Sequence, residues 1–405
     1  MRKISLLKNS IQEYDWGSKS AIPELLGRAE PAEKPQAELW MGAHPKAPSL
    51  VYCDGAWRSL LEVIAENPEE VLGRETAHKF SNELPFLFKV LAAAKPLSIQ
   101  AHPNQGQARE GFLRENETGI ALGAIDRNYR DANHKPEIIC ALTPFWALNG
   151  FRQVKEILRL LGEAQAPPLE KTVSFLRNHS GRQGLKEFFH HLMTMEKDKQ
   201  VEVVQTAAAF AEKRTEIEPV WTWIARLNEE YPGDAGVLSP AFLNLVKLEP
   251  QQAMYLPAGE LHAYLEGVGI ELMANSDNVL RGGLTAKPID VQELLNILNF
   301  AEAKVSILEP ERVASGEAVY PTETAEFVLS VVEVSGGIPF IGARKRSVEM
   351  MICTKGEATV TDLGDRETLR LTRGASIVIP AAVVQYRIEG EAEIYKAAVP
   401  LERVN

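Results

Sequence analysis

The sequence predicts a mainly β protein with an inserted helical module, and three observations support this class. An apolar run at 86–91 and an alternating segment at 97–102 have the character of strands. From about Arg152, apolar residues recur at helical spacing as far as residue 225. Residues 301–405 then return to short strands separated by turns, which is typical of a jelly-roll or barrel.

The composition is that of an ordinary globular protein of roughly two or three domains. The chain has 405 residues, of which 45% are hydrophobic and 24% charged, enough to bury a sizeable core. Its 44 basic and 55 acidic residues give a net charge of −11, so no basic field is available to neutralise nucleic-acid phosphates. We therefore expect no nucleic acid partner, and a small anion must be bound by a few local cations.

The N-terminus and the cysteines indicate the compartment. Arg2 and Lys3 precede only a short apolar patch, and no later run approaches the length of a membrane span. We therefore expect neither a signal peptide nor a membrane partner. The cysteines, Cys53, Cys140 and Cys353, are far apart and odd in number, which favours buried thiols in a reducing cytosol. The expected location is the cytoplasm.

Residues 1–30 are expected to form a strand followed by a loop with an aromatic turn. Trp16 in this turn can line a sugar pocket, because aromatic faces pack against the apolar side of a sugar ring, but a tryptophan in the core or at its rim is the commoner case. Glu38 begins a short strand at 38–42, and its carboxylate belongs either to a site or to a structural pair. Helical spacing follows at 58–82.

The stretch at 97–137 carries the first candidate site. On a strand, residues two apart project to the same face, so Ser98, Gln100 and His102 share a face. Glu137 starts a segment rich in β-forming residues and brings a carboxylate. One histidine, one carboxylate and one amide oxygen make an incomplete set for a divalent metal.

A later histidine can complete this set. His262 lies on a strand-like segment after a turn at 257–259. A lone histidine on a strand is more often structural than metal-binding, but here it can join Gln100, His102 and Glu137. Two histidines, a glutamate and a glutamine oxygen, with no thiolate, suit Zn²⁺ or a similar divalent ion, which can act as a Lewis acid.

Charged residues accompany these candidates. Lys135 and His134 precede Glu137 and are candidates for proton transfer. Arg281 and Lys287 are the cations that we expect to face an anionic substrate group. The alternative for each of these two is a solvated surface charge.

An internal echo links the end of the chain to the His262 segment. Residues 379–390 align without gaps on 256–267, and both copies keep Pro-Ala near the start and Glu-Gly at the end. Gln385 stands in the later copy where the earlier one has His262. The C-terminal unit is therefore expected to be a structural relative of the metal-bearing one that lacks its histidine. Its short strands are expected at 347–354, 357–361, 368–371 and 375–379.

Several motifs in a fixed order carry a family resemblance. They are Tyr14-Asp15-Trp16-Gly17, Glu38-Leu39-Trp40-Met41-Gly42, Ser98-Ile99-Gln100-Ala101-His102-Pro103, His134-Lys135-Pro136-Glu137, Pro257-Ala258-Gly259, His262-Ala263-Tyr264 and Ser276-Asp277-Asn278-Val279-Leu280-Arg281-Gly282-Gly283-Leu284-Thr285. Together they resemble the type I mannose-6-phosphate isomerases of the cupin superfamily. The resemblance runs from about residue 10 to the C-terminus and includes a helical insertion.

This resemblance implies a fold and a reaction. It implies two cupin-type jelly-roll β-barrels that flank an α-helical domain. We place the catalytic barrel at 1–152 and 237–300, the inserted helical domain at 153–236, and a C-terminal barrel without a metal site at 301–405. The implied enzyme uses zinc to interconvert mannose 6-phosphate and fructose 6-phosphate, moving a proton between C1 and C2 through a cis-enediol. It would serve carbohydrate metabolism, in mannose use or in GDP-mannose supply.

The resemblance also implies roles for residues at matching positions. The implied zinc ligands, with one ion per chain, are Gln100, His102, Glu137 and His262. The residues implied in catalysis are Arg281, Lys135, His134 and Asp277, with Arg281 the most closely tied to the reaction. The implied substrate-binding residues are Trp16, Glu38, Lys89, Ser98, Tyr264, Glu271 and Lys287.

One segment departs from the family pattern. Many relatives follow His-Pro with an acidic or amide residue and a lysine, whereas this chain has Asn104-Gln105-Gly106. The family resemblance therefore gives no support for a phosphate contact from this loop. The departure does not affect the four implied metal ligands.

Two other classes of protein compete with an isomerase. A cupin-type binding or storage protein with a vestigial site needs no cation and proton carrier beside its metal. A metal-dependent enzyme of different chemistry, such as a dioxygenase or an epimerase, is the other alternative. A glutamine ligand and the lack of a two-His-one-carboxylate cluster in one short motif disfavour a non-haem iron oxygenase. We therefore expect an isomerase that acts on a small sugar phosphate as a monomer.

Overall fold

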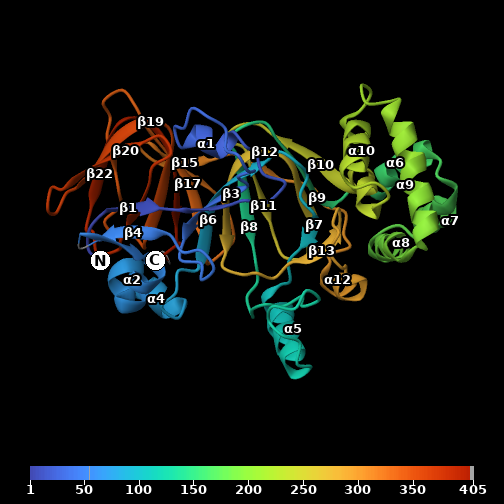
Figure 1. The fold of residues 1–405 in the computed structure, drawn as a ribbon, viewed down its shortest axis with the longest axis horizontal. Helices are drawn as coiled ribbons and strands as arrows, with labels where there is room; N and C mark the ends of the chain where they lie inside the picture. The colour runs from blue at the N-terminus through green and yellow to red at the C-terminus, as the bar shows by residue number, and fades with distance from the viewer. Residues whose placement is uncertain (54, 402–405) are drawn as a thin grey trace.

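Two antiparallel β-sheets form the body of the molecule, and a group of helices lies at one end of it (Figure 1). The structure is a computed structural model that describes residues 1–53 and 55–401, so the last residues of the expected C-terminal unit, 402–405, lie outside it. The prediction of a mainly β chain with a helical insertion is confirmed. Among the described residues, no helix combines the length and the apolar character needed to cross a membrane.

One sheet carries the expected metal ligands. Its strands are β2 (Ser10–Gln12), β3 (Glu38–Gly42), β6 (Phe86–Ala93), β7 (Ile99–Ala101), β8 (Glu137–Ala141), β9 (Phe145–Phe151), β10 (Leu243–Leu248), β11 (Ala253–Leu256), β12 (His262–Ala274), β13 (Leu280–Gly283) and β14 (Ile307–Leu308). Its main path has the order β14-β11-β8-β12-β6-β3-β2. Strand β12 also pairs with β7 and β9, and β7 pairs with β13. The expected ligands therefore come from strands that meet at β12.

Strand β6 confirms the apolar run at 86–91 as a strand buried along its whole length. Phe86, Phe88 and Val90 pack into a core shared with the second sheet. Lys89, which alternates with them, lines a large cavity. One face of the strand thus holds the two sheets together, and the other face belongs to the cavity.

The second sheet joins the two ends of the chain. Its strands are β1 (Ser5–Lys8), β4 (Leu50–Cys53), β5 (Ala56–Ser59), β15 (Glu311–Ala314), β16 (Glu317–Tyr320), β17 (Val328–Val334), β18 (Phe340–Ile341), β19 (Glu349–Asp362), β20 (Thr368–Thr372), β21 (Ser376–Ile379) and β22 (Tyr386–Ala398). Ser5 of β1 pairs with Val378 of β21, and Leu7 pairs with Val51 of β4. The first strand of the chain therefore continues the sheet formed by its last strands.

Strand β19 is longer than the sequence indicates, because it covers both strands expected at 347–354 and 357–361. Its register with β22 shifts after Cys353. Gly356 has a φ of 72°, a conformation that glycine adopts without strain. The chain bends at this bulge and continues in the same ladder, so a turn-like residue does not end the strand.

The helical module is anchored on β9. Its elements are α6 (Val154–Ala164), the 3₁₀ helix η1 (Pro167–Leu169), α7 (Glu170–Asn178), α8 (Arg182–Thr194), α9 (Lys197–Glu212), α10 (Pro219–Glu230), the 3₁₀ helix η2 (Ala235–Leu238) and α11 (Ser239–Phe242). Ile157 and Leu161 of the expected apolar stripe are buried. The ring of Phe151 at the end of β9 packs against Phe189 and Phe242, with centroids 5.9 and 6.5 Å away. The module therefore shares its apolar core with the first sheet.

The remaining helices lie in loops of the sheets. They are α1 (Ala21–Leu25), α2 (Leu60–Glu66), α3 (Pro68–Leu72), α4 (Arg74–Lys79), α5 (Gln105–Glu117) and α12 (Val291–Ile297). The segment that departs from the family pattern starts α5. Asn104 Oδ1 accepts from the backbone N–H of Gln107, and Gln107 Oε1 accepts from that of Asn104, both at 2.9 Å. Asn104 and Gln107 thus form a capping box that starts the helix, which gives this segment a structural role.

Candidate metal centre and substrate cavity

Neighbouring strands bring the expected ligands to one face. His262 on β12 is the register partner of Gln100 on β7, and Arg281 on β13 is the partner of Gln100 on its other side. Partners in an antiparallel pair point to the same face of a sheet. His102 follows β7 directly, and Glu137 begins β8. Of the alternating stretch predicted at 97–102, the structure forms a strand at Ile99–Ala101, and its Gln100 faces the same way as His262 and Arg281.

His102, Glu137 and His262 form a buried cluster whose ligand atoms all lie within 4.8 Å of one another. Nε2 of His102 lies 3.4 Å from Oε1 of Glu137, and Nε2 of His262 lies 3.4 Å from Oε2. Each of the three residues is only 1% exposed. The cluster is thus preformed by the fold and shielded from water.

The hydrogen bonds of the histidines leave both Nε2 atoms available. Nδ1 of His102 lies 2.7 Å from the carbonyl oxygen of Asn278. Nδ1 of His262 lies 3.0 Å from the carbonyl oxygen of Glu260. Since a carbonyl only accepts, each Nδ1 carries the proton and each Nε2 keeps its lone pair. Both Nε2 atoms and Oε2 of Glu137 are buried without a hydrogen-bond partner in the described part of the chain. Converging acceptors of this kind fit a cation, and imidazole with carboxylate suits zinc.

Burial and neighbouring charges prepare the cluster for a metal. Burial lowers the pKa of His102 to about 4, so its ring is neutral near neutral pH. Burial opposes the ionisation of Glu137, but Lys135 and His102 hold the pKa of its carboxyl well below the ordinary value. Nζ of Lys135 lies 3.0 Å from Oε1 of Glu137. Neutral imidazole and ionised carboxylate are the forms that bind metals.

A cavity of about 690 Å³ opens beside the cluster. Its volume lies in the range of small-molecule sites. Most of the expected site residues line it, namely Trp16, Glu38, Lys89, Ser98, Gln100, Lys135, Glu137, Tyr264, Glu271, Asp277, Arg281 and Lys287. The fold thus gathers residues from distant parts of the chain into one wall.

A buried ion triad forms part of that wall. Nζ of Lys89 lies 2.9 Å from Oε2 of Glu271 and 3.3 Å from Oε1 of Glu38. Burial favours the neutral amine, but the two carboxylates raise the pKa of Lys89 above its ordinary value. Trp40 Nε1 donates to Oε2 of Glu38 at 2.8 Å. The sequence left open whether Glu38 belongs to a site or to a structural ion pair. In the structure it pairs with Lys89 and also lines the cavity.

Aromatic side chains give the cavity apolar surface. Trp16 is partly buried against an apolar core cluster and also lines the cavity. It is thus a tryptophan at the rim of the core whose ring is available to the cavity. Tyr264 is buried, and burial raises its pKa well above the ordinary value, so its hydroxyl stays protonated. Such surfaces can pack against the apolar face of a sugar ring.

Three of the cations that line the cavity form a group of their own: Arg130, Arg281 and Lys287. Burial and the charge of Arg130 lower the pKa of Arg281. The charge of Arg281, with burial and the charge of Arg130, lowers the pKa of Lys287. Within residues 1–53 and 55–401, no carboxylate forms a salt bridge with any of the three. Uncompensated positive charge in an acidic protein is what an anionic ligand requires.

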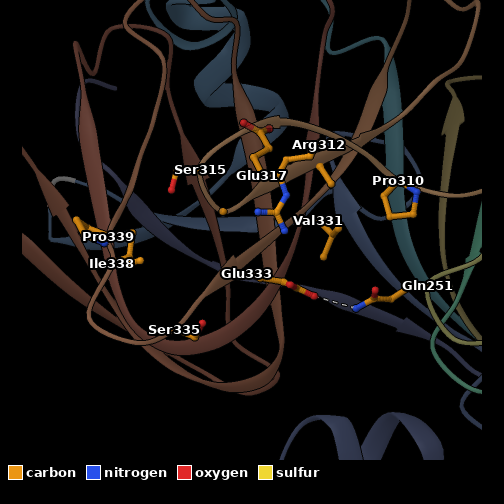
Figure 2. A pocket seen from close by; sticks show the side chains of 12 residues that line it. Gln251, Pro310, Arg312, Ser315, Glu317, Val331, Glu333, Ser335, Ile338 and Pro339 are labelled. Carbon is orange, nitrogen blue, oxygen red and sulfur yellow. Dashed lines mark hydrogen bonds between the residues drawn. The ribbon is translucent and has the colours of Figure 1, made fainter.

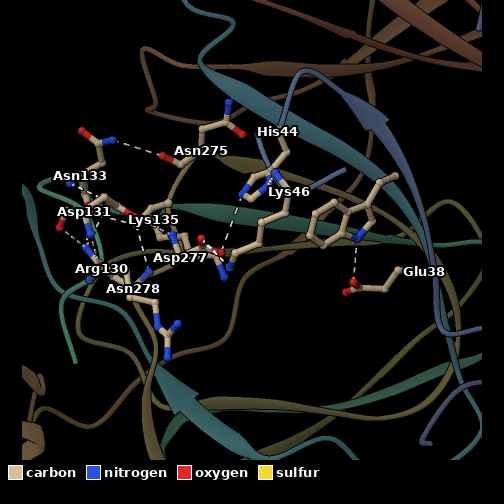
Figure 3. A network of polar contacts seen from close by, with 12 residues as sticks. Glu38, His44, Lys46, Arg130, Asp131, Asn133, Lys135, Asn275, Asp277 and Asn278 are labelled. Carbon is tan, nitrogen blue, oxygen red and sulfur yellow. Dashed lines mark hydrogen bonds and ion pairs between the residues drawn. The ribbon is translucent and has the colours of Figure 1, made fainter. Parts of the chain in front are cut away.

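The carboxylate of Asp277 also lines the cavity, where it lies beside Lys46 and His44 (Figure 3). Oδ2 of Asp277 lies 2.8 Å from Nζ of Lys46, and Oδ1 lies 3.7 Å from Nε2 of His44. Burial opposes ionisation, but the hydrogen bond and charge of Lys46 hold the pKa of Asp277 below its ordinary value. Burial lowers the pKa of His44, whose ring lies against Trp40 with centroids 5.0 Å apart.

His134 takes a different direction from its neighbour. Its Nε2 lies 2.9 Å from Oε1 of Glu326, just before β17 of the second sheet. It lies outside the lining of the cavity as far as the described residues define it. The geometry places Lys135, and not His134, beside the metal cluster.

The site also contains residues that sequence reasoning missed. His44, Lys46, Trp40 and Arg130 all line the cavity. Their positions in the chain offered a signal, because the loop at 44–46 directly follows the strand of Glu38 and Arg130 precedes the His134-Lys135 motif. Which loop side chains turn inward depends on loop conformation, and periodicity does not encode it.

A second cavity, of about 350 Å³, lies against the C-terminal sheet (Figure 2). Gln251 Nε2 donates to Oε1 of Glu333 at its wall, at 3.1 Å. Arg312 on β15 lines it and is exposed to solvent. In the part of the chain that the structure describes, no group of metal-type side chains gathers there. The first cavity is therefore the candidate site.

Profiles of one protein family match the chain in three consecutive segments. The catalytic domain of type I phosphomannose isomerase matches residues 4–154, and its helical insertion domain matches 160–243. The cupin domain of mannose-6-phosphate isomerase matches residues 317–399. The order agrees with a metal-bearing sheet, a helical module and a C-terminal sheet.

Individual proteins are similar over nearly their whole length. A mannose-6-phosphate isomerase of Salmonella typhimurium is 42% identical over 377 residues, covering 93% of this chain and 94% of the relative. One of Homo sapiens is 34% identical over 404 residues, covering 93% of each. A zinc-bound crystal structure of mannose 6-phosphate isomerase aligns with a TM-score of 0.90 at 38% identity, covering 98% of this chain and 100% of that one. An alanine variant of phosphomannose isomerase from Salmonella typhimurium aligns with the same coverage and a TM-score of 0.92.

Proposed function

Because this chain belongs to the type I mannose-6-phosphate isomerases, also called phosphomannose isomerases, we propose that it interconverts mannose 6-phosphate and fructose 6-phosphate in the cavity beside His102, Glu137 and His262. One observation carries this proposal. Glu137 of the preformed metal cluster lines the same cavity as three cations that form no salt bridge with a described carboxylate. A metal that polarises sugar oxygens and cations that hold a phosphate are the two requirements of such a substrate.

The proposed zinc ligands are His102, Glu137, His262 and Gln100, with one ion per chain. The orphaned Nε2 and Oε2 atoms support the first three. The register of Gln100 beside His262, and its place in the cavity wall, support the fourth. When bound there, zinc supplies Lewis-acid polarisation of sugar oxygens.

The phosphate end of the substrate is assigned to Arg130, Arg281 and Lys287. Arginine binds phosphate through paired N–H donors, while the lysine adds a point charge. Ser98 lines the same cavity and offers a hydroxyl. The aromatic surfaces of Trp16 and Tyr264 would then pack against the sugar ring.

Asp277 and Lys135 provide a base and an acid for opening the sugar ring. Asp277 is ionised beside Lys46, so its free oxygen can accept the proton of the C1 hydroxyl. Lys135, paired with Glu137, carries an ammonium that can donate a proton to the ring oxygen. In the open chain the Lys135 amine, neutral after its donation, would take the proton from C2 and return it to C1 through a cis-enediol, while Asp277 gives its proton to the C1 oxygen and accepts the one from the C2 oxygen. Arg281 would stabilise the negative charge that develops at these oxygens.

An isomerase assay with metal removal tests this function. The purified protein is assayed on mannose 6-phosphate before chelation, after chelation, and after zinc is restored. Loss and return of turnover with zinc are expected. A folded, zinc-loaded sample that does not turn over mannose 6-phosphate would overturn the assignment, and a related sugar phosphate would be tried next. Binding of the sugar phosphate without turnover would favour the binding-protein alternative.

The organisation of the chain is part of the proposal. We propose a catalytic unit at 1–152 and 237–300, a helical unit at 153–236 and a C-terminal unit from 301 onward, which agrees in order with the family profiles. We also propose a monomer that works in the cytoplasm. The cysteines support that compartment, since Cys53, Cys140 and Cys353 are all free thiols.

A further inference from the structure

Asn278 connects a metal ligand with a segment on the other side of the site. It lies in the chain between Asp277 and Arg281 and is completely buried. Its backbone carbonyl accepts the hydrogen bond from Nδ1 of His102 at 2.7 Å. That bond selects the tautomer of the ring and directs Nε2 toward the metal cluster.

The side chain of Asn278 uses its full hydrogen-bonding capacity on the loop at 130–133 (Figure 3). Its Oδ1 accepts from the backbone N–H groups of Arg130 at 2.7 Å and Asp131 at 3.2 Å. Its Nδ2 donates to the carbonyl oxygens of Asp131 and Asn133, both at 2.9 Å. An amide has two donors and two acceptor positions, so this one is saturated.

The contact between the two segments is reciprocal. Oδ1 of Asp131 accepts from the hydroxyl of Ser276 at 2.8 Å, and Oδ2 accepts from the backbone N–H of Asp277 at 2.7 Å. Each segment therefore binds the backbone of the other through a buried or half-buried side chain. A network in which every member is satisfied holds its parts in one arrangement.

Each segment carries functional side chains. The loop at 130–133 begins with Arg130, one of the three cavity cations assigned to the phosphate, and leads into Lys135. The segment at 276–281 contains Asp277 and Arg281, and its carbonyl at residue 278 orients His102. The contact between these two segments therefore helps to fix the distance between the cations assigned to the phosphate and the metal cluster.

We infer that Asn278 is a positioning residue that holds the zinc ligand His102 and the phosphate-binding Arg130 in register with each other. The inference rests on the proposed function, which assigns the anion to Arg130 and zinc to His102. If the amide loses its partners, the peptide at residue 278 is free to rotate its carbonyl away from Nδ1 of His102. At the same time the backbone of Arg130 loses its acceptor, and its guanidinium is no longer held at the cavity.

The substitution Asn278→Asp tests this directly. Aspartate has the same size and keeps the oxygen that accepts from the backbone N–H of Arg130, but it replaces the two N–H donors with an oxygen that faces the carbonyls of Asp131 and Asn133. Repulsion between this oxygen and the two carbonyls is expected to push the loop at 130–133, and Arg130 with it, away from residue 278. Zinc affinity, measured by competition with a chelator, is expected to fall about 10- to 100-fold. The dissociation constant of inorganic phosphate, measured by calorimetry on zinc-saturated protein, is expected to rise at least about threefold.

Asn133→Ala is the matched control. The exposed amide of Asn133 donates to the carbonyl of Asn275 at 3.3 Å, so it links the loop at 130–133 to the residue just before the segment at 276–281 without involving the side chain of Asn278. Both affinities are expected to stay at the wild-type values in this variant. A loss in the control equal to that in Asn278→Asp would show that any weakening of this contact suffices and would overturn the specific role of Asn278.

Other outcomes also decide the matter. A lower melting temperature of Asn278→Asp with unchanged zinc and phosphate affinities would mean that the residue is only structural. If this variant does not fold, Asp131→Asn weakens the reciprocal half of the contact and takes its place. A parallel fall of both affinities then supports the inference, and unchanged affinities overturn it. Neither measurement needs turnover, so a failure of the isomerase assay remains distinguishable from a failure of this inference.

Discussion

Nε2 of His134 lies 2.9 Å from Oε1 of Glu326, so the residue beside Lys135 is tied to the second sheet. The bond crosses between parts of the chain almost two hundred residues apart. Glu326 also accepts from the hydroxyl of Thr324 at 2.5 Å, which fixes the carboxylate from its own side. The C-terminal sheet therefore contributes to holding a strand that enters the metal site, although none of its strands carries a metal ligand in the proposed set.

The Glu326 carboxylate predicts a pH dependence of stability. Burial opposes its ionisation, but the bonds from His134 and Thr324 lower its pKa to about 2, below the ordinary value of 4.5. A lowered pKa stabilises the folded state above the unfolded value, and the contribution is lost as pH falls from 4.5 toward 2. Glu326→Gln is expected to reduce the free energy of unfolding by about 1–2 kcal/mol near pH 6, allowing for partial exposure. Urea unfolding near pH 6 and near pH 3 measures this, and the difference between variant and wild type should shrink at the lower pH.

Lys89 is expected to be essential for stability because it neutralises two buried carboxylates. Lys89→Met leaves Glu38 and Glu271 without their cation, and loss of one partner from a buried pair destabilises by about 3–5 kcal/mol. Lys95→Ala is the control, since its pair with Glu230 is largely exposed and such pairs contribute about 0–1 kcal/mol. Chemical denaturation compares the two, and equal losses would contradict the prediction.

Metal removal is expected to lower the melting temperature by several degrees, because an ion that binds only the folded state stabilises it. Zinc should restore the melting temperature of the wild type but have no effect on His262→Ala, which removes one of the orphaned Nε2 atoms. His191→Ala is the control, because His191 is an exposed residue of α8. Thermal unfolding with and without chelator measures the response. A zinc response that survives in His262→Ala would mean that the metal binds elsewhere.

Arg281 and Lys287 are expected to differ in their effect on turnover. Arg281→Ala removes a half-buried cation and is expected to lower kcat/KM by about 100-fold or more while zinc remains bound. Lys287→Ala removes an exposed charge and is expected to raise KM a few-fold with kcat little changed, and its effect should weaken in high salt. Steady-state kinetics with zinc analysis of each variant tests both. Loss of zinc from Arg281→Ala would contradict its assignment to the substrate.

Local patterns predicted a large share of the fold and of the candidate site. The period of two at 97–102 predicted a strand around Gln100, which the structure forms as β7, and the helical period after Arg152 predicted the inserted module. The same patterns predicted a strand near the N-terminus, but not that this strand, β1, pairs with β21 at the opposite end of the chain. They also predicted two strands where β19 is one, because a glycine that bends a strand at a bulge resembles one that ends it.

The sequence by itself determined which chemistry is available: histidines, a glutamate and a glutamine at strand positions, cations after a polar segment, and family motifs in order. Only the tertiary structure decided how these groups meet. It turned Lys135 toward Glu137 and His134 toward Glu326, added Arg130 to the cavity, and made Asn278 the link between His102 and the loop at 130–133. The physical reason is that residue type and spacing act within one strand or helix, whereas the direction of a loop side chain depends on the register and packing of segments far apart in the chain.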